Sequence, residues 1–313
     1  MNTTRYNTVV LAGGSGYLGT VLANHFKPLA DKVIILSRTA QPALDNIETV
    51  TWDGQQADDW TQHLEGAALL VNLCGKNVNC RYTEKNKQDI LLSRTTPTLL
   101  LGKVIGQLQH PPALWINITS ATIYRHAEDR PQDEETGETG YGFSIDICRR
   151  WEEAFFQTPT PSTRKVALRM GIVLGRRDGV FPRLLNLVKY GLGGQQGDGS
   201  QYISWIHEQD AARCIEWLSN HPEQTGIINC TAPYAIQNHE FMSIIRKTYG
   251  MPFGLPAPTL LLEIGAALIG TETELILKSR WVTPKRLLDA GFHFHYPEAN
   301  QAMHDLLSIR ELS

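Results

Sequence analysis

The stretch TVVLAGGSGYLG, residues 8–19, decides the fold of this chain. Its apolar run Thr8–Ala12 predicts a buried strand, and the segment Thr20–Phe26 predicts a helix. Glycines between a strand and a helix let the backbone turn tightly, so that a pyrophosphate can reach the amide groups at the helix start. This order predicts a dinucleotide site, for which the alternative is an ordinary glycine-rich turn. The residues expected at the cofactor are Gly13, Ser15, Gly16, Tyr17, Leu18 and Gly19.

The next apolar run, Lys32–Leu36, predicts a second buried strand, and Ser37 and Arg38 stand at its end. A ribose with a free 2′-hydroxyl is usually held at this position by Asp or Glu. Arg38 is instead a planar cation that matches a 2′-phosphate. The pair therefore favours NADP over NAD, and the alternative is a solvated arginine without a specific partner.

The composition is typical of a globular protein with a large core: 313 residues, 42% hydrophobic and 19% charged. The formal net charge is -3 and no long basic run occurs, which argues against a nucleic-acid partner. The apolar stretch Leu260–Ile269 is too short to span a bilayer, and residues 1–5 contain no apolar signal segment. We therefore expect a cytoplasmic protein without a membrane partner.

The cysteines are odd in number and scattered, without the spacing of a metal site. We expect free thiols and no bound metal. The five residues are Cys74, Cys80, Cys148, Cys214 and Cys230.

Apolar runs alternate with helical segments through the first half of the chain. Strands are predicted at Ala68–Leu73, Leu114–Thr119 and Lys165–Gly171, and helices at Thr83–Gln109 and Phe143–Phe156. This alternation predicts an α/β fold with a doubly wound parallel sheet, whose ligand binds at the carboxyl ends of the strands. Residues just after the runs are therefore site candidates: Cys74, Gly75, Thr119, Ser120, Gly171 and Ile172.

Beyond about Gly175 the alternation fades and glycine-rich turns replace it. We expect residues 1–175 to form the nucleotide-binding domain, completed by a strand that returns at about 226–232. Residues 176–313 then form mainly a smaller C-terminal substrate lobe, which includes a short C-terminal domain at about 250–305. Within the lobe, Asn238–Tyr249 is predicted to be a helix opened by its asparagine as the cap.

Several short motifs are spread over nearly the whole chain. They are Gly13-x-x-Gly16-x-x-Gly19, Asn72-Leu73-x-Gly75, Ser93-Arg94-Thr95-Thr96, Trp151-Glu152 and Trp205-Ile206-His207-x-x-Asp210. With them the chain resembles the short-chain dehydrogenase/reductase superfamily in its extended, epimerase-like form. Within that superfamily it is similar to an atypical subgroup, the epimerase family proteins. The resemblance implies a Rossmann domain that binds NADP, followed by a short C-terminal domain.

The resemblance also implies particular cofactor contacts. It places Arg94 within reach of the cofactor, and Asp89 lies about one and a half helical turns before it. Cys74 stands where the subgroup usually has alanine, and a thiol can serve there as a small apolar group. The remaining implied contacts are Ser37 and Arg38 at the adenosine phosphate, Leu73 and Cys74 along the ribose, and Ile172 near the nicotinamide.

Typical family members use Ser, Tyr and Lys, and the lysine cation lowers the pKa of the tyrosine that transfers the proton. Ser120 takes the serine position here, and Tyr141 stands near the tyrosine position unless it is simply a loop residue before a helix. The lysine position holds Ile145, so the activating charge is missing. Proton transfer would then be slow or would use another group, such as Tyr124, Arg125 or His207.

His207 and Asp210 invite comparison with a catalytic dyad, since they stand one turn apart at the start of a predicted helix that runs to Leu218. The alternative is structural: Asp210 caps the helix or holds a backbone turn, and His207 packs between the two lobes.

Two functions fit these residues. The first is an NADP-dependent oxidoreductase or nucleoside-sugar epimerase-like enzyme, which acts on a carbonyl or sugar substrate such as a nucleotide sugar. The second is an NADP-binding sensor or regulatory protein without efficient turnover, which the aliphatic Ile145 favours. By analogy with extended members, the helices predicted at 83–109 and 143–156 would form the contact of a homodimer.

Overall fold

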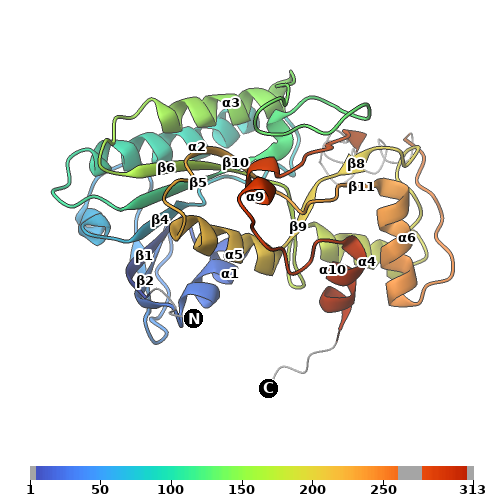
Figure 1. Cartoon of the computed structure of the whole chain (residues 1–313), viewed down its shortest axis with the longest axis horizontal. Coiled ribbons are helices and arrows are strands. Elements are labelled where there is room, and N and C mark those ends of the chain that lie inside the picture. The colour runs from blue at the N-terminus through green and yellow to red at the C-terminus, as the bar shows by residue number, and fades with distance from the viewer. Residues whose placement is uncertain (1–4, 260–276, 309–313) are drawn as a thin grey trace.

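The computed structural model describes residues 5–259 and 277–308, and its centre is a seven-stranded parallel sheet (Figure 1). The strand order is β10-β6-β5-β4-β1-β2-β3. This order confirms the predicted doubly wound sheet, since β1 lies inside the sheet and the chain winds outward from it in both directions. The strands are β1 (Tyr6–Ala12), β2 (Ala30–Ser37), β3 (Ile47–Thr51), β4 (Leu69–Asn72), β5 (Leu114–Ser120), β6 (Arg164–Met170) and β10 (Gly226–Cys230).

Helices cover both faces of the sheet, as Figure 1 shows. On one face lie α1 (Tyr17–Phe26) and α5 (Glu208–Ser219), and on the other lie α2 (Glu84–Ile105) and α3 (Phe143–Phe156). Successive strand residues point to opposite faces of the sheet. Val9 therefore packs in the core on the side of α1 and α5, and Val10 in the core on the side of α2 and α3. Both are fully buried, which explains why the strand is apolar without alternation.

Two local predictions need correction. Helix α1 begins at Tyr17 and not at Thr20, because the backbone leaves its extended conformation directly after Gly16. The strand β3 and the short 3-10 helix η1 (Asp59–Leu64) were not predicted. All but one of the residues of β3 are only half-buried, as suits an edge strand, and this leaves too weak a hydrophobic pattern to recognise.

The second lobe has its own small core around Trp205, Phe241 and Met303. It contains two short strand pairs, β7 (Ile172–Leu174) with β9 (Trp205–His207), and β8 (Tyr202–Ile203) with β11 (Ile236–Gln237). Its helices are α4 (Val180–Lys189), α6 (Asn238–Tyr249) and α10 (Ala299–Leu307), whereas Leu287 of α9 (Lys285–Asp289) packs in the core of the first lobe. Residues 260–276, which include the apolar stretch Leu260–Ile269, lie outside the described residues. Among the residues described, no helix is long and apolar enough to cross a membrane.

The helix predicted over Asn238–Tyr249 is confirmed as α6, but its predicted cap is wrong. Asn238 is the first helical residue, and the cap position belongs to Gln237. The Asn238 side chain is buried and forms two hydrogen bonds with Gln196. Its Oδ1 accepts from the backbone amide of Gln196 at 2.8 Å, and its Nδ2 donates to Oε1 of Gln196 at 3.0 Å. The asparagine thus fixes the glycine-rich loop of the second lobe.

His207 and Asp210 tie the last segment of the chain to the start of α5. Asp210 is buried and accepts hydrogen bonds of 2.8 Å from the backbone amides of His295 and Tyr296. The His207 ring packs on Tyr296 at 3.9 Å, and its Nε2 lies 3.3 Å from Oδ2 of Asp305. These contacts agree with the structural interpretation of both side chains, but the cap of α5 is His207, which accepts from the amide of Gln209, and not Asp210.

We predict that Asp210→Ala lowers the free energy of unfolding by about 3 kcal/mol, because it leaves Arg213 and two backbone amides without their buried acceptor. Asp146→Ala is the matched control, since Asp146 forms an exposed ion pair with Arg149 at the same i, i+3 spacing. Its cost should stay below about 1 kcal/mol. Urea denaturation followed by circular dichroism measures both, and equal losses would contradict the role given to Asp210.

Candidate nucleotide-binding site

The glycine turn between β1 and α1 allows close approaches that a side chain would block. Gly13 has φ +72°, and a Cβ atom there would lie 2.7 Å from Sγ of Cys74. A Cβ atom on Gly19 would lie 2.1 Å from the carbonyl oxygen of Gly14, so α1 packs directly on the turn. The glycine spacing found in the sequence is therefore a packing requirement.

The first turn of α1 is open to an anion. Its cap residue Gly16 is exposed, has extended backbone and provides no side chain, and a Cβ atom there would meet nothing within 4 Å. The first turn also contains no acidic residue. The amide groups of this turn and the positive end of the helix dipole therefore face space that a pyrophosphate can occupy.

Ser15 is exposed beside Gly16, and Leu18 packs against the sheet core. Tyr17 has a different partner, since its hydroxyl lies 1.9 Å from the position that a Cβ atom on Gly175 would take. The aromatic ring therefore joins the glycine turn to the chain that leaves β7.

The pair at the end of β2 divides into a buried and an exposed residue. Ser37 is buried, and its Oγ accepts a hydrogen bond of 3.2 Å from the amide of Thr39. Arg38 is exposed. Since β1 and β2 run parallel in register, with Ala12 beside Leu36, Arg38 emerges at the same edge of the sheet as the glycine turn.

The loop after β4 is held by a buried asparagine. Asn72 Oδ1 accepts from the amide of Cys74 at 3.1 Å, and Asn72 Nδ2 donates to Thr98 and Asn117. Leu73 and Cys74 are therefore fixed beside the glycine turn. Burial raises the pKa of the Cys74 thiol to about 12, so this side chain is a neutral packing group at neutral pH.

Asp89 and Arg94 both lie on α2 but have different surroundings. Asp89 forms an ion pair of 2.8 Å with Lys76, which lowers the pKa of the carboxyl group. Arg94 lies further along the helix, where its guanidinium stands 5.2 Å from the ring centre of Trp151 and 3.1 Å from the position that a Cβ atom on Gly75 would take. Sequence order alone does not distinguish these two environments.

The remaining cofactor candidates lie at the ends of β5 and β6. Thr119 is buried and donates to Glu152 at 3.2 Å. A Cβ atom on Gly171 would lie 2.9 Å from the carbonyl oxygen of Ser204, and Ile172 donates its amide to that same oxygen at 2.9 Å. Gly171 therefore permits the close contact between the sheet and the second lobe.

The three catalytic candidates have dissimilar environments. Ser120 ends β5, where its half-buried hydroxyl accepts from the amide of Thr122 and caps the 3-10 helix η2 (Ala121–Ile123). Tyr141 is 93% exposed, just before α3. Tyr124 is buried and donates to Oδ1 of Asn229 at 3.0 Å, and burial raises the pKa of its phenol. Ile145, at the lysine position, is buried.

Sequence reasoning did not predict a buried ion pair beside these residues. Arg169 of β6 makes two hydrogen bonds of 2.8 Å to Glu152 of α3, and its guanidinium lies 4.9 Å from the ring centre of Tyr124. Glu152 stands in the Trp151-Glu152 motif and Arg169 in the strand predicted at Lys165–Gly171, but nothing in the sequence pairs the two.

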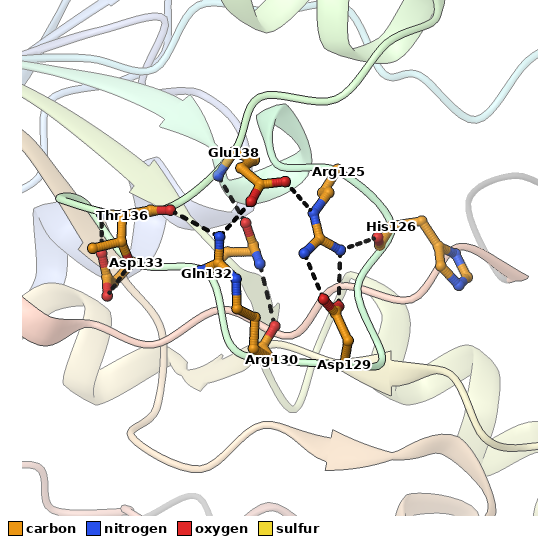
Figure 2. Close-up of polar contacts among 8 residues, drawn as sticks. All are labelled: Arg125, His126, Asp129, Arg130, Gln132, Asp133, Thr136 and Glu138. Carbon is orange, nitrogen blue, oxygen red and sulfur yellow. Dashed lines mark hydrogen bonds and ion pairs between the residues drawn. The ribbon is translucent and has the colours of Figure 1, made fainter.

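Arg125 begins a loop whose two ends are connected by ion pairs between its own residues (Figure 2). Its guanidinium donates to Asp129 and Glu138, and Arg130 also pairs with Glu138. The two carboxylates, Asp129 first, raise the pKa of Arg125. Arg125 is thus a loop-closing cation and a poor proton donor.

The sheet, the open helix start and the crowded glycine turn define a Rossmann-like nucleotide-binding architecture. Residues 9–231 match the model of the NAD dependent epimerase/dehydratase family, and residues 257–306 match a domain of unknown function, DUF1731. The chain belongs to the NAD dependent epimerase/dehydratase family.

Relatives match nearly the whole length of the chain. The epimerase family protein SDR39U1 of Bos taurus is 30% identical over 305 residues, which cover 96% of this chain and 99% of the relative. The crystal structure of human epimerase family protein SDR39U1 (isoform 2) with NADPH is similar at a TM-score of 0.84 and 28% identity, over 96% of this chain and 98% of that one. The crystal structure of a nucleoside-diphosphate sugar epimerase from Corynebacterium glutamicum is similar at a TM-score of 0.74 and 25% identity. The match covers 97% of this chain and 59% of that one.

We predict a large loss of stability for one glycine of the turn and a small loss for another. Gly19→Ala should cost about 2–3 kcal/mol or more in the free energy of unfolding, because its Cβ atom meets rigid backbone. Gly16→Ala should lower the free energy of unfolding by less than about 1 kcal/mol, because its Cβ atom would have no neighbour within 4 Å. Urea denaturation compares them, and similar costs would show that the turn relaxes around a side chain.

Proposed function

We propose that this protein is an NADP-dependent oxidoreductase or epimerase-like enzyme that acts on a carbonyl or sugar substrate. The observation that carries the proposal is the open start of α1 at Gly16 with Arg38 at the neighbouring strand end. The first can hold a pyrophosphate and the second a 2′-phosphate, and NADP contains both. The NADPH in the human SDR39U1 crystal supports this choice.

The chain would hold the cofactor along one edge of the sheet. Amides of the Gly13–Gly19 turn would bind the pyrophosphate, and Ser37 and Arg38 the adenosine 2′-phosphate. Bound NADP would supply the hydride chemistry, while the protein orients it against the substrate. The remaining proposed cofactor contacts are Leu73, Cys74, Gly75, Thr119, Gly171 and Ile172, which lie at or near the carboxyl ends of β4, β5 and β6.

The proton-transfer step is the weakest part of the site. Ser120 would orient a substrate oxygen from the end of β5, and the exposed Tyr141 would have to turn toward it. Tyr124 is already bonded to Asn229, and Ile145 provides no cation to stabilise a phenolate. These observations favour a second candidate, a sensor that binds NADP without efficient turnover.

The substrate class proposed for the enzyme includes nucleotide sugars, on the support of the sugar epimerase from Corynebacterium glutamicum. The two candidates differ in whether the redox state of bound cofactor changes. Incubation of NADPH-loaded or NADP-loaded protein with carbonyl compounds and nucleotide sugars, followed by absorbance of the reduced nicotinamide, would detect an oxidoreductase. Product analysis covers an epimerase, whose cofactor returns to its starting state.

We predict that Arg38→Ala weakens NADPH binding about tenfold to a hundredfold and changes NADH binding little, because only NADPH has the 2′-phosphate. Titrations that follow nicotinamide fluorescence measure both. Arg183→Ala, which removes another exposed arginine, on α4, is the control. Equal NADPH and NADH affinities in the unaltered protein would refute the preference for NADP.

We also propose a homodimer that pairs α2 and α3 with their copies. Leu92 and Leu99 of α2 and Phe156 of α3 are exposed apolar residues, with exposed fractions of 47%, 38% and 41%. Covering them in a helix bundle would be favourable.

We predict a dimer at micromolar concentration in analytical ultracentrifugation, and a monomer after Leu92→Glu combined with Leu99→Glu, because the added charges oppose burial. Leu44→Glu, at a 60% exposed leucine outside these helices, should leave the dimer intact. A monomeric unaltered protein would rule out the arrangement.

A further inference from the structure

Five large apolar side chains are exposed together on the second lobe. They come from the ends of α4 and α6 and from the residues that follow these helices, which pack side by side away from the central sheet (Figure 1). Their exposed fractions lie between 42% and 81%. The five residues that form this lobe-end patch are Tyr190, Leu192, Tyr249, Phe253 and Leu255.

Contacts between backbone and side chains hold the two segments of the patch against each other. The amide of Leu255 donates to the carbonyl oxygen of Gly191 at 2.8 Å. Gly191 has φ +73°, and a Cβ atom there would lie 2.8 Å from Cε2 of Phe253, so the aromatic ring lies close over this glycine. Arg246 of α6 donates to the carbonyl oxygen of Gly193. The patch is therefore one surface and not two independent loop tips.

The two segments that build the patch contain charges of one sign only. Residues 180–195 and 241–258 include no Asp or Glu. Lys189 is exposed in the last turn of α4, and Lys247 is exposed in the last turn of α6. The charged residues of both segments are Arg183, Lys189, Arg246 and Lys247. Exposed apolar side chains are thus combined with positive charge.

This combination fits the surface of an anionic lipid bilayer. Clustered exposed apolar side chains often mark a contact with a protein or a membrane. Aromatic and leucine side chains gain by entering the boundary between headgroups and acyl chains, where the hydroxyl group of a tyrosine stays hydrated. Each lysine near a layer of negative lipid adds a favourable attraction.

A second copy of this chain fits the same patch less well. In a symmetric dimer the patch would face itself, so the lysines of one copy would approach those of the other with no acidic residue in these segments to compensate them. Lysine is also depleted in interfaces between proteins. The charge pattern therefore favours lipid over a second copy.

We propose that the lobe-end patch is a peripheral membrane-binding surface that docks on a bilayer of anionic lipid. Its aromatic and leucine side chains enter the headgroup boundary, and Lys189 and Lys247 lie at the lipid phosphates. The contact requires no spanning helix and does not depend on the proposed function. It departs from the expectation of no membrane partner, which considered spanning and signal segments alone.

The test is co-sedimentation of the full chain with vesicles of phosphatidylcholine, or of phosphatidylcholine and phosphatidylglycerol in equal amounts. We expect binding to the anionic vesicles that weakens as salt is added. Phe253→Ser combined with Leu255→Ser should weaken it about tenfold or more, because less apolar surface is buried. Lys189→Glu should weaken it about fivefold or more, because a favourable charge is replaced by a repelled one.

Tyr234→Ser and Lys85→Glu are the matched controls and should bind as the unaltered protein does. Tyr234 is 64% exposed in the same lobe but lies before α6, and Lys85 is an exposed lysine at the start of α2. Thermal unfolding followed by circular dichroism confirms that each variant is folded.

The inference is overturned if the unaltered protein does not bind anionic vesicles or binds neutral ones equally well. It is also overturned if the patch variants retain binding, or if the controls lose as much binding as they do. Self-association that disappears with Phe253→Ser and Leu255→Ser, in a protein that binds no vesicles, would assign the patch to a second copy instead.

Discussion

The close contact between backbone segments at the glycine turn is the constraint on which the rest of the site depends. A Cβ atom on Gly19 would lie 2.1 Å from Gly14, and one on Gly13 would lie 2.7 Å from Cys74. Because these glycines have no side chains, α1 can start close to the carboxyl end of β1, and the loop after β4 can lie against the turn. The open helix start at Gly16 is the consequence, and it is the part of the fold that can receive an anion.

Buried polar groups then fix the parts that the turn does not reach. Asn72 holds the β4 loop through the amide of Cys74, and Asp210 holds the segment before α10 through the amides of His295 and Tyr296. In both cases one side chain satisfies backbone donors that would be costly to leave unpaired. Specific polar contacts therefore position these segments in addition to apolar packing.

The site differs from the Ser, Tyr and Lys pattern of typical family members in the position of its positive charge. An aliphatic Ile145 replaces a cation at the start of α3, while further along this helix Arg94 lies over Trp151 and Arg169 pairs with Glu152. Positive charge is thus present beside α3, and the charge of Arg169 is already compensated by Glu152. A fold shared with epimerases does not by itself define the reaction, because function follows from the placement of such groups.

The sequence by itself determined the order of strand, glycine turn and helix, the alternation that produces the parallel sheet, and the helices Phe143–Phe156 and Asn238–Tyr249. These features depend on local periodicity and on glycine, which act over a few residues. Only the tertiary structure decided the edge strand β3, the partners of Asp210 and the pairing of Arg169 with Glu152. Each of these depends on residues far away in the chain, and a local pattern contains no information about which distant groups meet.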